Sequence, residues 1–210
     1  TKQFSSPINI AIPSGNFGNA YSAWFGRDNG LSINEIFCAS NVNDVLTRFI
    51  STGKLEPKET IPSVAPSMDI QIPSSLERLI YNFEGDASSF YDQLQNEKIA
   101  KLSEESVVRL QNIFSSLSFN DEMILKEIDL FYKNYGWVID PHTATALSSS
   151  VTFSSTLPVV GVATASPEKF SDVISKTIDE FRVENTKNEE KYFVEKANSS
   201  LVENTIKECL

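Results

Sequence analysis

Apolar and polar positions along this chain follow two alternating patterns. Short apolar runs rich in β-branched residues predict buried strands, and they occupy residues 8–12, 35–39 and 157–163. Between these runs, apolar side chains recur every three or four residues, which predicts helices. Alternation of strands with helices is typical of a parallel sheet with flanking helices. We therefore expect a single α/β unit.

Capping residues predict where the helices begin and end. Asn120 is a natural N-cap for a helix over 121–135, which should bury Ile124 and Ile128 and stop at Gly136. Further helices are expected over 20–27, from Asn41 or Asn43 to about Gly53, from Ser74–Ser75 through Phe83, from Pro141 to Ser150, and over 168–181 behind Pro167. Residues 57–73 should form a proline-punctuated crossing, 87–119 short surface helices, and 183–210 a peripheral helix and tail.

The loop over residues 13–19, Pro-Ser-Gly-Asn-Phe-Gly-Asn, directly follows the first predicted strand. Glycine lets the backbone approach an anion closely, and N–H groups of the loop and of the next helix supply donors and partial positive charge. The spacing is neither G-x-G-x-x-G nor the P-loop, since no lysine follows. Judged by its glycines alone, the loop is equally well a tight strand-to-helix turn.

Two other polar segments also follow predicted strands. Residues 41–44 come after the strand ending at Ala39, and Thr164 comes after the strand ending at Ala163. Ligands of open α/β sheets bind beyond the carboxyl ends of the strands. We therefore expect these two segments and the loop at 13–19 to share one site.

Composition narrows the classes of function. The 210 residues carry a net charge of −10 with mixed signs, which disfavours a nucleic-acid or anionic-membrane surface. One histidine and two cysteines make neither a metal set nor a disulfide framework. No apolar run approaches the roughly 18 residues that span a bilayer, and no signal peptide is visible. We expect a cytoplasmic protein.

Five stretches together resemble the threonine synthase family of the longer, microbial and fungal type. They are Ser14-Gly15-Asn16-Phe17-Gly18-Asn19; Ala39-Ser40-Asn41-Val42-Asn43-Asp44 with Arg48-Phe49; Ser67-Met68-Asp69-Ile70 with Pro73 and Glu77-Arg78; Asp140-Pro141-His142-Thr143-Ala144; and Thr164-Ala165-Ser166-Pro167-Glu168-Lys169-Phe170. No single stretch is decisive, but their order and spacing are specific. The resemblance extends to about Phe181.

The resemblance implies a fold-type II, tryptophan synthase β-like enzyme that uses pyridoxal phosphate. It implies that the cofactor phosphate is bound by Ser14, Gly15, Asn16, Phe17, Gly18 and Asn19, and that the Thr164 hydroxyl meets the pyridine nitrogen. The family's Schiff-base lysine lies upstream of the phosphate loop, and the chain begins at Thr1 shortly before the first strand. We therefore expect the C-terminal half of such an enzyme, inactive alone. Residues 1–182 would be the C-terminal part of the cofactor-binding large domain, and 183–210 a peripheral helix and tail.

The reaction implied by the resemblance converts O-phospho-L-homoserine and water to L-threonine and phosphate. A related phospholyase would share these cofactor residues yet release a keto acid. A lyase or dehydratase of the same fold acting on serine or threonine is a further alternative. From a different class, the chain could be a non-catalytic phosphate-binding or interaction module. The implied partners are the small-molecule substrate and the missing N-terminal half.

Several single residues allow two interpretations. Thr164 is either the pyridine partner or a helix cap before Pro167. His142 is favoured as a structural histidine hydrogen-bonded near Asp140 rather than a catalytic one. Asp69 and Arg78 are similar cases, and Arg78 is expected to pair with Glu77 or another acid rather than bind a substrate phosphate. Ser166 stands where the family commonly has histidine, so the role of that histidine is in doubt here.

Overall fold

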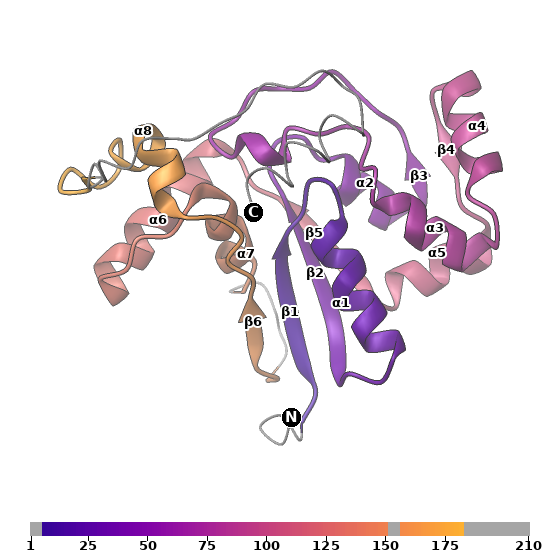
Figure 1. Cartoon of the computed structure of the whole chain (residues 1–210), viewed down its shortest axis with the longest axis horizontal. Coiled ribbons are helices and arrows are strands. Elements are labelled where there is room, and N and C mark those ends of the chain that lie inside the picture. Colours follow the sequence, from indigo (N-terminus) through magenta and orange to yellow (C-terminus); the bar gives the residue numbers. More distant parts are fainter. Residues whose placement is uncertain (1–5, 151–155, 183–210) are drawn as a thin grey trace, which may run out of the picture.

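A four-stranded parallel sheet forms the centre of the molecule (Figure 1). The computed structural model describes residues 6–150 and 156–182. The strands are β1 (Ile8–Pro13), β2 (Ile33–Ser40), β5 (Phe114–Ser118) and β6 (Val159–Gly161), in the order β5-β2-β1-β6. A small antiparallel pair, β3 (Lys54–Leu55) and β4 (Ala100–Lys101), lies apart from this sheet. The expected parallel α/β architecture is confirmed.

Helices cover both faces of the sheet, because side chains along each strand alternate between two apolar cores. Ile12 and Cys38 pack into the core formed with α1 (Gly18–Asp28), α2 (Val45–Thr52), α3 (Leu76–Glu84), α4 (Ser88–Glu97) and α5 (Glu104–Gln111). Ala11 and Phe37 pack into the opposite core, formed with α6 (Asp121–Tyr135), α7 (Pro141–Ser150) and α8 (Ser171–Ile174). The 3₁₀ turns η1 (Pro66–Met68) and η2 (Pro167–Phe170) complete the described elements.

Local capping signals account well for α6. The side chain of Asn120 accepts a hydrogen bond from Met123 N at 2.9 Å, and Gly136 ends the helix with a φ of 71°. Ile124 and Ile128 are fully buried, as the spacing predicts. The N-cap expected for α2 is wrong, because Asp44 occupies that position and the side chains of Asn41 and Asn43 bind elsewhere.

Three other expectations differ from the structure. Residues 114–118 form β5 rather than a surface helix, because the serines of this polar run bond neighbouring strands and helices, as Ser116 does with Thr47 at 2.7 Å. The run at 157–163 yields only the three-residue β6, which pairs with β1 alone among the described residues, so Val160 is 39% exposed rather than buried. The helix behind Pro167 breaks into η2 and the four-residue α8. The helix and tail expected over 183–210 lie outside the described residues.

Candidate cofactor site

The chain leaves two neighbouring strands in opposite directions at one end of the sheet. After β1 it enters α1 on one face, and after β6 it enters η2 and α8 on the other face (Figure 1). Such a divergence at the carboxyl ends of parallel strands opens a crevice, the usual ligand position in open α/β sheets. A cavity of about 280 Å³ lies here, lined by Pro13, Ser14, Gly15, Asn16, Phe17, Gly18, Asn19, Ser67, Met68, His142, Thr164 and Ala165.

The loop after β1 is held in an unusual conformation. Ser14 N donates to Ala39 O at 2.8 Å, which fastens the start of the loop to β2. Phe17 has a φ of 69°, a left-handed conformation that is an outlier for a bulky residue. Its ring is nonetheless 1% exposed and lies 5.4 Å from the ring of Phe114. Core packing therefore fixes a strained backbone beside the cavity, a combination common at ligand sites.

The described residues offer the cavity hydrogen-bond donors but no formal cation. Phe17 at the N-cap of α1 has no side-chain acceptor, so the first-turn N–H groups of this helix lack a side-chain cap. The Ser14 hydroxyl is buried without a hydrogen-bond partner among the described residues. The thiol of Cys38 lies beside it, but sulfur is a poor partner. Among residues 6–150 and 156–182, neither lysine nor arginine lines the cavity. An anion here would be bound by amide dipoles and hydroxyls.

Asn16 anchors the loop to the neighbouring helix α3. Its side-chain oxygen accepts hydrogen bonds from Ser74 N at 2.6 Å and from Ser74 Oγ at 2.9 Å. Its backbone carbonyl accepts from Ser75 N at 3.2 Å. The amide oxygen and the backbone carbonyl of Asn16 therefore bind protein groups, which leaves its backbone N–H and its amide nitrogen for a ligand.

The opposite wall of the cavity is the turn η1, held by a network around Asp69. Asp69 Oδ1 accepts from Asn41 Nδ2 at 2.6 Å and from Asn43 Nδ2 at 3.0 Å, and Ser63 also donates to its carboxylate. Because these asparagines bind Asp69, residues 41–44 do not line the cavity. The expectation of one site shared by all three segments is therefore wrong for 41–44. That segment instead supports the wall that presents Ser67 and Met68.

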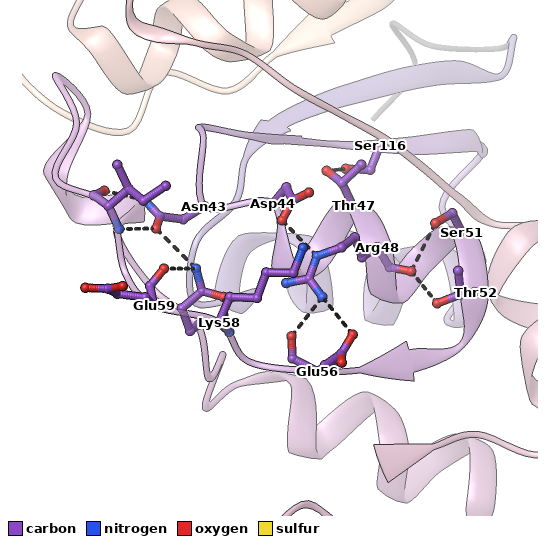
Figure 2. Close-up of polar contacts among 12 residues, drawn as sticks. Asn43, Asp44, Thr47, Arg48, Ser51, Thr52, Glu56, Lys58, Glu59 and Ser116 are labelled. Carbon is purple, nitrogen blue, oxygen red and sulfur yellow. Dashed lines mark hydrogen bonds and ion pairs between the residues drawn. The ribbon is translucent and has the colours of Figure 1, made fainter. Parts of the chain in front are cut away.

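The crossing that leads to η1 is fastened to α2 by Arg48 (Figure 2). Arg48 Nε donates to Asp44 Oδ1 at 2.8 Å, and Nη1 donates to the carbonyl of Glu56 at 2.8 Å. Asn43 Oδ1 accepts from Ile61 N at 2.9 Å a little further along the same crossing. These contacts tie a proline-rich segment without regular structure to α2 and to the residues just before it.

A third wall comes from His142 at the start of α7 and from Thr164 after β6. His142 Nδ1 lies 2.8 Å from Asp140 Oδ1, and its Nε2 accepts from Ser67 N at 3.1 Å. The hydrogen bond expected near Asp140 is therefore present, and His142 also faces the cavity. Thr164 is exposed on the cavity side, and its backbone N–H donates to Thr143 Oγ1 at 3.3 Å.

All seven residues expected from the resemblance to contact the cofactor line this cavity: Ser14, Gly15, Asn16, Phe17, Gly18, Asn19 and Thr164. Sequence reasoning missed the part played by Ser67, Met68, His142 and Ala165. Ser67 and Met68 belong to one of the five resembling stretches, which was a signal of their importance but not of their place. Arg78, in the described part of the chain, donates to Ser75 Oγ at 3.4 Å and stacks on the Tyr21 ring at 5.4 Å rather than pairing with Glu77.

The described residues show neither a metal-binding cluster nor a membrane-spanning helix. No group of three or more histidine, cysteine, aspartate or glutamate side chains there could hold a metal ion. None of the helices in residues 6–150 and 156–182 has the length and apolar character needed to cross a membrane.

The fold is that of the fold-type II pyridoxal phosphate enzymes, and the crevice lies at one end of its parallel sheet. The structure superposes with a TM-score of 0.84 on the crystal structure of pyridoxal phosphate-bound threonine synthase from Brucella melitensis, at 26% identity, covering 99% of this chain and 47% of that one. A fungal L-serine ammonia-lyase from Rhizomucor miehei shares the fold alone, with a TM-score of 0.51 and 15% identity. No protein-family model matches the chain.

Within that class the chain is homologous to the threonine synthases. Threonine synthase from Pseudomonas aeruginosa is 31% identical over 175 residues, which is 80% of this chain and 37% of the relative. Human threonine synthase-like 1 is 31% identical over 198 residues, or 91% of this chain and 27% of the relative. The chain thus spans less than half the length of the curated relatives it matches.

Proposed function

We propose that the cavity binds pyridoxal phosphate, with its phosphate against residues 14–19 and its pyridine nitrogen at the Thr164 hydroxyl. The fit of the phosphate end is supported by the uncapped N–H groups at the start of α1 and by the unpartnered Ser14 hydroxyl. The protein carries a net charge of −10, so an anionic ligand must be attracted by such local dipoles.

The chemistry follows from the partners that these residues provide. When bound, pyridoxal phosphate supplies an electron sink for carbanion chemistry. Thr164 offers a neutral hydroxyl rather than a carboxylate, so it does not favour a protonated pyridine nitrogen, and the sink stays moderate. A moderate sink suits elimination and replacement at the β and γ carbons of an amino acid.

We propose that residues 1–182 are the C-terminal part of the cofactor-binding domain of a longer enzyme. This enzyme would convert O-phospho-L-homoserine and water to L-threonine and phosphate. The observation that carries the proposal is the convergence of all seven expected cofactor residues on one cavity in a homologue of the threonine synthases. The lysine that binds the cofactor covalently would come from the part of the enzyme outside this chain.

The full-length protein tests this proposal directly. Incubation with O-phospho-L-homoserine should release phosphate and L-threonine in equal amounts. Equal amounts of phosphate and a keto acid would instead assign the protein as a phospholyase. Binding of pyridoxal phosphate without phosphate release would leave a non-catalytic module.

The 210-residue chain by itself should not turn over this substrate, because no lysine of the chain lies in the family's cofactor-binding motif. Borohydride reduction in the presence of pyridoxal phosphate, followed by peptide mapping, identifies any lysine that binds the cofactor. Stoichiometric labelling of one lysine together with turnover would contradict this expectation.

A further inference from the structure

A buried carboxylate lies just behind the cavity wall. Asp140 precedes α7 and is 1% exposed. Its Oδ1 accepts from His142 N at 2.9 Å and from His142 Nδ1 at 2.8 Å, and its Oδ2 accepts from the Thr143 hydroxyl. Burial by itself raises the pKa of the Asp140 carboxyl, but hydrogen bonds from His142 and Thr143 outweigh it and lower the pKa below the ordinary value of 3.8. Asp140 is thus an acceptor for two neighbouring side chains at once.

Through His142, Asp140 reaches the turn that faces the phosphate loop. A carboxylate at Nδ1 fixes the proton on that nitrogen, so Nε2 carries the lone pair that accepts from Ser67 N at 3.1 Å. The turn η1 packs closely against Gly15: a Cβ added at Gly15 would lie 2.8 Å from Met68 Cα and 3.0 Å from Ser67 O. The position of the His142 ring therefore determines how closely η1 and the phosphate loop approach.

Through Thr143, Asp140 reaches the other end of the cavity. The Thr143 hydroxyl donates its hydrogen to Asp140, which leaves its lone pairs to accept from Thr164 N at 3.3 Å. Thr164 follows the three-residue edge strand β6, where the ladder to β1 has already ended. A side chain anchored in α7 therefore holds the backbone of Thr164.

We propose that Asp140 is the positioning residue of the cofactor site and acts through two branches. The His142 branch sets the phosphate end, and the Thr143 branch sets the pyridine end. The inference rests on the proposed function, since it assigns the two branches to the two ends of pyridoxal phosphate. Asp140 itself does not line the cavity. A helix cap alone would need only the bonds to backbone N–H groups, whereas Asp140 also holds two side chains that lead to opposite walls.

The His142 branch is tested in the full-length holoenzyme by replacing His142 with each of the two amide side chains. His142→Asn places its amide near the position of Nδ1 and lacks an acceptor for Ser67 N, whereas His142→Gln places an oxygen near the position of Nε2. His142→Asn should raise the dissociation constants of pyridoxal phosphate and of inorganic phosphate for the apoenzyme roughly tenfold, the equivalent of one positioned hydrogen bond. His142→Gln should recover only part of that loss, because it restores an acceptor for Ser67 N but lacks the donor at Nδ1 that Asp140 binds. The absorbance spectrum of the bound cofactor should stay the same in both variants.

The Thr143 branch is tested by a different readout. Thr143→Val should shift the absorbance spectrum of the bound cofactor and lower kcat, with the affinity for inorganic phosphate unchanged. Thr143→Ser keeps the hydroxyl, so its cofactor spectrum and kcat should match those of the unchanged protein. The matched control is Thr145→Val, because Thr145 is equally buried in α7 and donates to His142 O at 2.7 Å, yet does not line the cavity. The control should change only the melting temperature.

The outcomes separate the inference from the proposed function. If His142→Asn and Thr143→Val lower only the melting temperature, as the control does, the positioning role of Asp140 is overturned. If both changes alter phosphate affinity and spectrum alike, the two-branch assignment is overturned. Gly15→Ala is measured alongside: a lowered melting temperature with unchanged cofactor affinity in that variant would overturn the cofactor site itself, whatever the His142 variants show.

Discussion

Gly15→Ala is the sharpest test of the phosphate loop, because the added methyl group has no room. Its Cβ would lie 2.8 Å from Met68 Cα and 3.0 Å from Ser67 O, both of them backbone atoms that cannot rotate away. Carbon atoms pack comfortably at about 3.5–4.0 Å, so the loop and η1 must separate by roughly 0.7–1.2 Å. Gly15 is required by this close approach rather than by a positive φ.

The cost of this separation falls on stability and on cofactor binding. Overpacking of this kind destabilises a fold by about 1–3 kcal/mol. Amide donors displaced by nearly 1 Å also lose their alignment with a phosphate, and each charge-assisted hydrogen bond contributes about 1.5–3 kcal/mol. We therefore expect a loss of at least tenfold in affinity for pyridoxal phosphate, equivalent to about 1.4 kcal/mol.

The assay is fluorescence titration of the full-length apoenzyme with pyridoxal phosphate, with thermal melts of the apoenzyme in parallel. Gly18→Ala in the same loop is the matched control for the thermal melts, because its Cβ would meet only Ser75 Oγ at 3.6 Å, an ordinary contact. The melting temperature of this control should stay the same or rise, since alanine has a higher helix propensity than glycine. An unchanged affinity and melting temperature in Gly15→Ala would refute the close-approach argument.

Three further predictions follow from the described residues. Thr164→Val should lower turnover, and Thr164→Asp should alter the cofactor spectrum. The N-cap of η2 is Ser166 rather than Thr164, so a shift in melting temperature with an unchanged spectrum would give Thr164 a purely structural role. Asp140→Asn should destabilise the protein at neutral pH, and this loss of stability should shrink below about pH 4, because a carboxyl with a lowered pKa loses its stabilising effect as it is protonated. Thermal melts of the two proteins across pH measure the loss, and a loss that does not depend on pH would contradict the prediction. Burial raises the pKa of the Cys38 thiol to about 12, so Cys38 should resist iodoacetamide in the native protein and react on unfolding. Modification of the native protein at the rate of a free thiol would contradict this prediction.

Elements governed by local signals could be predicted from the sequence. The helix α6 has a capping side chain at Asn120, a left-handed glycine at Gly136 and a regular apolar stripe, and all three act within a few residues of one another. The strands β1 and β2 are buried apolar runs, so hydrophobicity alone identifies them. The loop over residues 13–19 could be identified as a candidate anion site because its glycines and polar residues are consecutive in the sequence.

Features that depend on distant partners could not be predicted in this way. The strand β5 has the sequence Phe-Ser-Ser-Leu-Ser, and it forms through its ladder to β2 together with the bonds of its serines to neighbouring elements. Asn41 and Asn43 are good caps by residue type, but the carboxylate of Asp69, more than 25 positions away, competes successfully for their amides. The place of His142 in the cavity wall likewise depends on a contact with Ser67, 75 positions earlier in the chain.

The strand β6 also affects how this chain behaves in isolation. Among the described residues its only ladder is to β1, so its outer edge presents backbone N–H and C=O groups beside the exposed Val160. Such an edge is a template on which another strand can add, whether from the remainder of a longer protein or from a second copy of this chain. We expect the isolated chain to self-associate through this edge as its concentration rises. Val160→Lys should reduce light scattering without disturbing β1, because a lysine at a sheet edge opposes the approach of a second strand.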